Sequence, residues 1–190
     1  MIDKKHITGI ILSGGKSSRM GTDKGFLMFE GKPFVQYSIE ALKPLVSNTI
    51  IISDNVDYDI FGLDRMEDII ENAGPLAGIY SGLKYSSTEY SLVLSCDVPL
   101  IKTKILEKLI HAIDTNSEVI QIESNGKNMP LIALYKKQCE HTFLKLLNVG
   151  ERRLQFAVNQ CKLKNVVLNE EEELFTQNIN TPEQLKAIIK

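Results

Sequence analysis

An apolar segment that runs into a glycine-rich, cationic loop constrains this chain most, and it occupies residues 7–24 (ITGIILSGGKSSRMGTDK). Its first six residues include four aliphatic ones without polar alternation, which is typical of a parallel strand buried on both faces. Gly14 and Gly15 then allow the backbone to turn and to bring N–H groups close to an anion. Arg19 and Lys24 add positive charge. The segment therefore predicts a phosphate-binding loop at the carboxyl edge of an α/β sheet.

The spacing of the glycines excludes two common phosphate loops. A Walker A loop that ended at Lys16-Ser17 would need a glycine at position 10, which is isoleucine here. The dinucleotide fingerprint G-x-G-x-x-G is also absent from the segment. The remaining pattern, L-S-G-G-K-S-S-R-M-G-x-x-K, resembles the signature loop of nucleotidyltransferases that join a nucleoside triphosphate to a phosphate-bearing acceptor. A surface turn with incidental lysines is the alternative interpretation.

Composition limits the architecture and the kind of ligand. With 190 residues, of which 43% are hydrophobic and 24% charged, the chain is long enough for one compact domain, expected over 1–190. The 22 basic and 24 acidic residues give a net charge of −2, so no large basic field for nucleic acid and no polybasic membrane patch is expected. The predicted ligand is therefore a small molecule.

The cysteines and the hydropathy pattern predict a cytoplasmic location. Cys96, Cys139 and Cys161 show no C-x-x-C spacing and are odd in number, as in a reduced cytosolic protein. No apolar run reaches the ~18 residues that a membrane-spanning helix needs. We therefore expect neither a disulfide framework nor a membrane anchor.

Alternating strand and helix patterns predict an α/β fold with a mostly parallel sheet. The Asn125-Gly126 pair between two strand-like runs signals a hairpin, so we expect one antiparallel strand. Thr103 and Thr181 are expected to cap helices, and the carboxylates of 170–173 are expected in a solvated loop. Strands are expected at 49–52, 66–70, 90–95, 118–122, 130–135 and 163–168, and helices over 34–45, from a turn at 72–78 to Leu83, from Thr103, over 143–150 and 151–161, and from Thr181.

Polar side chains follow several of the expected strands. Asp97 comes after the strand 90–95, and a carboxylate opposite a phosphate loop suits Mg²⁺ that also holds phosphate oxygens. Its alternative interpretation is a turn cap before Pro99. Asn178 and Asn180 lie on alternate positions and point the same way if this stretch is extended. Buried asparagines that satisfy backbone groups are the alternative there.

Five segments together resemble the molybdenum cofactor guanylyltransferase family over almost the whole chain. They are LSGGKSSRMGTDKG, GPLAGIYSGL, LVLSCDVP, LNVGERRL and FTQNINTPEQL, in that order. The resemblance implies a single-domain, Rossmann-like fold of glycosyltransferase-A type. It also implies the transfer of GMP from Mg-GTP to molybdopterin that bears molybdenum, with pyrophosphate as the other product, and transient contact with molybdoenzymes or cofactor-insertion proteins.

The resemblance also implies roles for single residues. Arg19, Lys24 and Asp97 are the expected catalytic residues, and Asp97 is the expected metal ligand. Residues expected to bind GTP are Leu12, Ser13, Gly14, Gly15, Lys24, Ser53, Asp68, Gly78 and Asp97, and those expected on the acceptor side are Asn178, Asn180 and Arg152.

Two positions depart from the family pattern. The family often has an asparagine that touches the nucleotide at the position of Ser53, and here Asn55 follows two residues later. A histidine is common before Pro130, where this chain has Asn128-Met129, in a loop expected near the acceptor.

The expected mechanism is electrostatic. A phosphate monoester is ionised at neutral pH, so the acceptor needs no general base, and His6, His111 and His141 are expected at the surface. Backbone N–H groups of residues 13–15, together with Arg19, Lys24 and Mg²⁺, would neutralise the triphosphate.

Two other functions remain open at this point. One is a cytidylyltransferase that acts on molybdopterin or on a sugar or alcohol phosphate, and the other is a GTP-binding delivery module without turnover. A purine site is expected to use the close backbone approach that Gly74, Gly78 and Gly82 permit, and this favours GTP over CTP and ATP.

Overall fold

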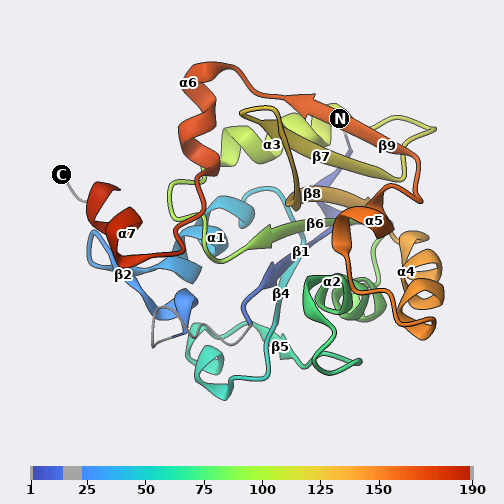
Figure 1. Cartoon of the computed structure of the whole chain (residues 1–190), viewed down its shortest axis with the longest axis horizontal. Coiled ribbons are helices and arrows are strands. Elements are labelled where there is room, and N and C mark those ends of the chain that lie inside the picture. Colours follow the sequence, from blue (N-terminus) through green and yellow to red (C-terminus); the bar gives the residue numbers. More distant parts are fainter. Residues whose placement is uncertain (1, 15–22, 189–190) are drawn as a thin grey trace.

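The computed structural model describes residues 2–14 and 23–188. A seven-stranded sheet forms its centre, with strand order β5-β4-β1-β6-β8-β7-β9 (Figure 1). Among these strands only β8 runs opposite to the others, as the pairing of β6 and β7 with β8 shows. The sheet strands are β1 Ile7–Leu12, β4 Asn48–Ile52, β5 Asp64–Met66, β6 Tyr90–Ser95, β7 Val119–Ser124, β8 Lys127–Lys136 and β9 Leu163–Val167, and a separate hairpin consists of β2 Met28–Phe29 and β3 Lys32–Pro33.

Helices connect the strands on both faces of the sheet. The α-helices are α1 Phe34–Leu42, α2 Gly74–Tyr85, α3 Thr103–His111, α4 Cys139–Asn148, α5 Leu154–Val158, α6 Glu170–Glu173 and α7 Pro182–Ile188. Four 3₁₀ helices are described, η1 Lys4–His6, η2 Lys24–Phe26, η3 Val56–Phe61 and η4 Leu174–Thr176. The expected mostly parallel α/β fold with an antiparallel strand is confirmed.

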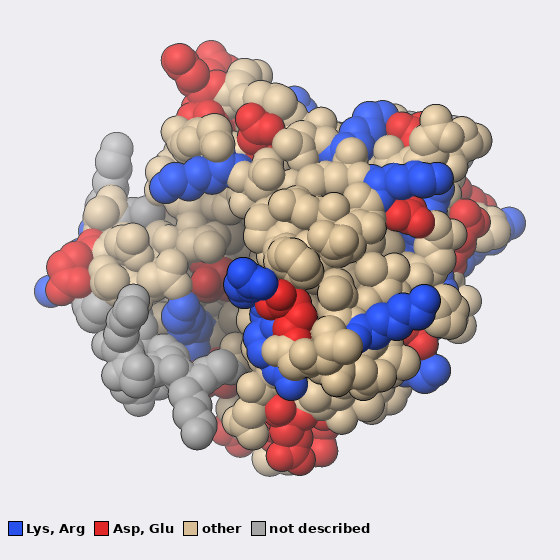
Figure 2. Space-filling view, turned by 45° about the vertical axis from the view of Figure 1, so that its right-hand side comes forward, with Lys and Arg blue, Asp and Glu red and all other residues tan. Residues whose placement is uncertain are grey.

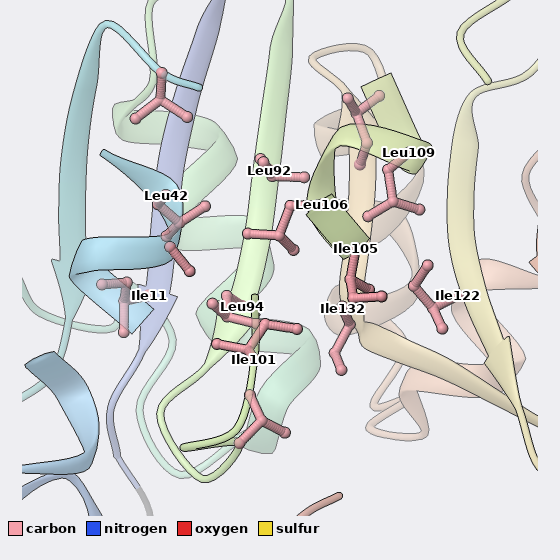
Figure 3. Close-up of a cluster of buried hydrophobic side chains, with 14 of the residues drawn as sticks. Ile11, Leu42, Leu92, Leu94, Ile101, Ile105, Leu106, Leu109, Ile122 and Ile132 are labelled. Atoms are coloured by element: carbon pink, nitrogen blue, oxygen red, sulfur yellow. The ribbon is translucent and has the colours of Figure 1, made fainter. Parts of the chain in front are cut away.

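Two hydrophobic cores lie on the two faces of the sheet because successive strand residues point to opposite faces. Ile11 faces α1 and α3, whose Leu42, Ile105 and Leu109 fill the first core (Figure 3). Ile10, its neighbour in the sequence, belongs to the second core, which α2, α4 and α5 cover. This double burial explains why β1 lacks polar alternation.

Four neighbouring strands end level with one another. Leu12 is the register partner of both Ile52 and Ser95, and Ile52 is in turn the partner of Met66. The loops that follow β1, β4, β5 and β6 therefore begin along one edge of the sheet. Figure 1 shows β2 and α7 beyond this edge, at the ends towards which the arrows of β1 and β6 point.

Several local predictions are confirmed. The strand β6 covers the residues predicted for it. Asn125 and Gly126 have φ values of 51° and 67°, as a two-residue hairpin turn requires, and they join β7 to β8. At α7, the backbone N–H of Gln184 donates to Thr181 Oγ1 (3.2 Å), and Gln184 Oε1 accepts from the N–H of Thr181 (3.1 Å), which is the predicted capping box.

Other predicted elements are wrong in position or type. The strand expected at 66–70 lies earlier, at Asp64–Met66, where pairing with β4 decides its position. Gly74 already belongs to α2, so most of the turn expected at 72–78 is helical. The helix expected over 151–161 is confined to Leu154–Val158.

Two predictions about helix ends also need correction. Thr103 does not cap α3: Lys102 is the N-cap residue, and the Thr103 hydroxyl donates to the backbone oxygen of Ala41 (3.1 Å). The carboxylates of Glu170–Glu173 form the helix α6 and not a loop. Asn169 caps this helix, and Lys108 forms an ion pair with Glu172 (2.7 Å).

The surface agrees with the balanced composition. On the face shown in Figure 2, lysine and arginine side chains lie among aspartate and glutamate side chains. Among the described residues, none of the helices combines the length and the apolar content needed to cross a lipid bilayer. Cys96, Cys139 and Cys161 are all free thiols.

Candidate functional site

The site lies where the order of the strands reverses. From β1 the chain crosses to β4 and β5 on one side, and it later returns to β6 on the other side of β1. In open α/β sheets the carboxyl ends of such a strand pair are where ligands bind. The loops after β1 and β6 contain the predicted glycine-rich segment and Asp97.

Lys24, Asp97 and Asn180 meet at this edge from three distant parts of the sequence. The ammonium nitrogen of Lys24 lies 3.5 Å from Asp97 Oδ2 and donates a hydrogen bond to Asn180 Oδ1. The side chains of Lys24 and Asp97 are 27% and 13% exposed, so both are shielded but can be reached from solvent. The structure thus brings together two residues predicted to be catalytic and one predicted for the acceptor side.

Asp97 is held by its own surroundings. The Ser95 hydroxyl donates to Asp97 Oδ1, and the backbone oxygen of Asp97 accepts from the N–H of Ile179 (2.8 Å). This second bond ties the segment that contains Asn180 to the end of β6. Ser95 was missed by the sequence analysis, although its position two residues before Asp97 at a strand end was an available signal.

A second group at the same edge contains Leu12, Asp68 and Gly78. A Cβ added at Gly78 would lie 3.2 Å from Leu12 Cδ2 and 3.6 Å from Asp68 Oδ1, so three residues predicted to bind GTP are neighbours. Asp68 Oδ1 is buried without a hydrogen-bond partner among the described residues. Burial, followed by the negative charge of Asp54, raises the pKa of the Asp68 carboxyl to about 6.

The start of the phosphate loop is only partly available for an anion. The backbone N–H of Ser13 donates to the oxygen of Ile52 (3.1 Å), so β4 already engages this N–H. Its side chain is fully buried, and its hydroxyl has no partner among the described residues. Gly14 is exposed, whereas Gly15 and Arg19 lie outside the described residues.

Ser53 and Asn55 take part in a turn after β4. Ser53 is 4% exposed, and its hydroxyl oxygen accepts from the backbone N–H of Asn55 (3.2 Å). The Asn55 side-chain amide donates to Asp23 Oδ2 (3.2 Å). Asn55 therefore contacts the loop that carries Lys24.

Arg152 and Asn178 have different surroundings from Asn180. The Arg152 guanidinium donates to the backbone oxygens of Leu147 (3.0 Å) and Glu151 (2.9 Å), at the end of α4. Asn178 is exposed and lines a cavity of about 570 Å³ together with Leu100 and other residues. The recorded contacts of the described residues do not link either side chain to Asp97.

Gly78 and Gly82 let α2 pack closely on β1. A Cβ at Gly82 would lie 2.7 Å from Ile10 Cγ2, so its absence lets α2 pack closely on β1. Leu12 fills the corresponding space at Gly78. Gly74 has a φ of +71° at the start of α2. The space beside Gly78 and Gly82 is therefore occupied by β1 side chains, and their expected place near a purine stays a prediction.

The ligand set fits a metal that arrives with a substrate. Among the described residues no group of three or more histidine, cysteine or carboxylate side chains could hold a metal ion. Mg²⁺ commonly uses one or two carboxylates, with phosphate oxygens and waters as its other ligands. Asp97 offers such a carboxylate, because its side chain is partly exposed and its Oδ2 has only the ammonium group of Lys24, at 3.5 Å, as a recorded partner among the described residues.

A doubly wound sheet with a lysine and a carboxylate at its reversal point is typical of α/β proteins that bind phosphorylated ligands. The sequence profile of the MobA-like NTP transferase domain matches residues 9–164, and the chain belongs to this family of nucleotidyltransferases. The chain is 33% identical over 182 residues to a probable molybdenum cofactor guanylyltransferase of Flavobacterium johnsoniae, with 96% of each chain covered. It is 34% identical over 181 residues to the molybdenum cofactor guanylyltransferase of Yersinia pestis, covering 93% of this chain and 92% of the relative.

Solved structures share the fold. Molybdopterin-guanine dinucleotide biosynthesis protein A from Archaeoglobus fulgidus superimposes with a TM-score of 0.82 at 20% identity, over 96% of both chains. The 4-diphosphocytidyl-2C-methyl-D-erythritol synthase from Anaerococcus prevotii gives a TM-score of 0.77 at 14% identity, covering 98% of this chain and 95% of the other. Because proteins named for a guanine and for a cytidine product share this fold, the fold alone does not select the base.

Proposed function

We propose that the chain transfers GMP from Mg-GTP to molybdopterin that carries molybdenum, with pyrophosphate as the second product. The family and the names of the curated relatives support this reaction. The observation that carries the proposal is the meeting of Lys24, Asp97 and Asn180 at the reversal point of the sheet. Phosphoryl chemistry depends on positioned charges of this kind.

The substrates are assigned to parts of the site as follows. The triphosphate is assigned to Ser13, Gly14, Gly15, Arg19 and Lys24, the base and ribose to Leu12, Ser53, Asp68 and Gly78, the Mg²⁺ to Asp97, and the acceptor to Asn178, Asn180 and Arg152. When bound, Mg²⁺ supplies positive charge to the triphosphate oxygens.

Asp68 is suited to select guanine. Its buried Oδ1 lacks a partner among the described residues, and it lies beside Gly78 and Leu12. A carboxylate can accept two parallel N–H donors. The Watson–Crick edge of guanine presents two such neighbouring donors, whereas the edges of adenine and cytosine do not, so the ionised Asp68 favours GTP.

The chemistry needs charge neutralisation more than proton transfer. The acceptor phosphate is ionised at neutral pH, and it attacks without help from a base. In keeping with this, His6, His111 and His141 are exposed on η1, α3 and α4. Lys24 balances the charge of Asp97 until a nucleotide binds, and its ammonium group then holds the phosphates against the repulsion of the incoming dianion.

Pyrophosphate release tests the proposal directly. The purified protein is incubated with Mg²⁺ and molybdenum-loaded molybdopterin, and GTP, CTP and ATP are supplied in turn. We expect release to be fastest with GTP. Fastest release with CTP would contradict guanylyl transfer, and GTP binding without release would favour a delivery module.

We also propose that the chain acts as one domain over 1–190 in the cytoplasm and passes its product to molybdoenzymes or insertion proteins through transient contacts. Its three free cysteines support a reducing compartment. To check the compartment, free thiols are blocked in the cell before the protein is isolated, and the blocked cysteines are then counted in the denatured protein. We expect three blocked cysteines for each chain.

A further inference from the structure

The carboxylate of Asp23, the residue that precedes Lys24, accepts hydrogen bonds from three donors. Its Oδ1 accepts hydrogen bonds from the Tyr58 hydroxyl (2.6 Å) and from the backbone N–H of Gly25 (3.0 Å). Its Oδ2 accepts one from the side-chain amide of Asn55 (3.2 Å). Asp23 is thereby the N-cap of η2, whose first residue is Lys24.

Tyr58 is the fully buried donor in this group. It is 0% exposed, and its ring packs on Phe26 and Phe61, with centroid distances of 4.6 and 6.1 Å. Burial raises the pKa of the Tyr58 phenol well above its ordinary value, so the hydroxyl remains protonated and donates. Since a buried hydroxyl needs a partner, its bond to Asp23 fixes the distance between η3 and the start of η2.

Gly25 shows how closely the two segments fit. A Cβ added at this position would overlap the hydroxyl and the ring of Tyr58. The backbone of Gly25 therefore lies directly against the phenol. Asp23 and Gly25, the residues on either side of Lys24, are both in contact with the same tyrosine.

The side chain of Lys24 contacts residues other than this anchor. Its ammonium group reaches Asp97 on the β6 loop and Asn180 before α7. The main chain at Lys24 is thus fixed by η3, while its charged end lies among the residues assigned to the triphosphate and the metal. A shift of the η2 turn would move the ammonium group with it.

We propose that Tyr58 is a positioning residue for Lys24, and that it acts through Asp23 to fix where the ammonium group meets the phosphates of the nucleotide. Asn55, the N-cap residue of η3, donates to the same carboxylate. The identity of the nucleotide rests on the proposed function, whereas the anchoring of Lys24 does not. Misplacement of a catalytic group by about 1 Å can cost up to ~10²-fold in rate, so the lost anchor should be measurable.

The test is a double-mutant comparison. Tyr58→Phe removes the hydroxyl and keeps the ring, and it is made in the wild-type protein and in the Lys24→Ala variant. We expect kcat/KM for GTP to fall about 10-fold in the wild-type background and less than about 2-fold in Lys24→Ala, because the anchor then has no ammonium group left to position. Equal losses in both backgrounds, or a loss below about 2-fold in the wild-type background, would overturn the proposal.

A matched control separates positioning from stability. Tyr37→Phe also deletes a tyrosine hydroxyl that donates to a protein oxygen, that of Phe29 at 2.7 Å. We expect it to lower Tm without changing kcat/KM for GTP. If Tyr58→Phe does not fold, Asn55→Ala replaces it, because this variant removes another donor to Asp23 from a less buried residue. Asn55→Ala is also expected to lower kcat/KM for GTP only when Lys24 is present.

A second readout keeps the proposed function and the role of Tyr58 distinguishable. If the wild-type protein transfers no guanylyl group, the proposed function fails. The wild-type protein, Tyr58→Phe, Lys24→Ala and the double variant are then compared by their equilibrium affinity for Mg-GTP. An effect of Tyr58→Phe on this affinity only when Lys24 is present supports the positioning role, and an effect that does not depend on Lys24 refutes it.

Discussion

Replacement of Asp68 by asparagine tests the site through stability and specificity at once. Burial and the neighbouring Asp54 raise the pKa of the Asp68 carboxyl from 3.8 to about 6. Between these values the unfolded chain loses its proton while the folded chain keeps it, so the free energy of unfolding falls as pH rises. A shift of about two units corresponds to ~3 kcal/mol for a fully buried group, and solvent screening at this half-buried side chain reduces it to ~1 kcal/mol.

We therefore expect Asp68→Asn to unfold about 2–4 °C above the wild-type protein at pH 7.5, and to show no such gain near pH 4. Differential scanning fluorimetry at the two pH values measures this difference. The preference of Asp68→Asn for GTP over ATP and CTP, expressed as a ratio of kcat/KM values, should be ~10- to 100-fold lower than that of the wild-type protein. An equal gain in Tm at both pH values, or an unchanged preference, would refute the reasoning. In the wild-type protein, KM for GTP should rise as pH falls through about 6.

Four further substitutions test the proposed site and the packing behind it. Asp97→Ala should lower transfer by more than ~10²- to 10³-fold while the far-UV spectrum and Tm stay unchanged, and activity retained at limiting Mg²⁺ would exclude its role. Lys24→Ala and Arg19→Ala should lower kcat with little change in Tm, whereas a large loss of Tm at full specific activity would point to a structural role. Gly82→Ala should cost about 1–3 kcal/mol in chemical denaturation, because its Cβ would lie 2.7 Å from Ile10 Cγ2; an unchanged denaturation midpoint would contradict this close packing.

The central strands were predictable because burial on both faces leaves a strong pattern in the sequence. The strand Tyr90–Ser95 is buried throughout and was located at both ends. The hairpin at Asn125-Gly126 was equally predictable, since the turn needs residues that tolerate positive φ. By contrast, β5 is a short edge strand of mixed polarity, and only its pairing with β4 shows where it ends.

Helix ends were predictable only where the cap is local. Thr181 and Gln184 lie close in sequence and satisfy each other's backbone groups, as predicted. The Thr103 hydroxyl instead finds a carbonyl on α1, 62 residues away, which no local pattern reveals. The helix at Glu170–Glu173 has a local signal, the capping box of Asn169 and Glu172, which the sequence analysis missed, and Lys108 of α3 adds an ion pair to Glu172.

The candidate site divides in the same way. The approach of Lys24 to Asp97 at one edge of the sheet was predictable from residue types that follow buried strands. By contrast, the hydrogen bond from Tyr58 to Asp23 joins residues 35 positions apart, and the one from Lys24 to Asn180 joins residues 156 positions apart. Their geometry follows from tertiary packing, which a single sequence does not display.

The pairing of β1 with β6 has a consequence for how the protein forms. Ile7 is the register partner of Tyr90, so the central strand gains its second neighbour only after more than 80 intervening residues have been arranged. Parallel pairing over such separations has a high contact order and folds slowly. During synthesis at the ribosome, β1 can pair with β4 long before β6 is made. The edge of β1 that later pairs with β6 stays open to other chains in that interval. The hydrophobic strand that leads into the phosphate loop is therefore also a segment of the nascent chain that benefits from rapid synthesis or chaperone protection.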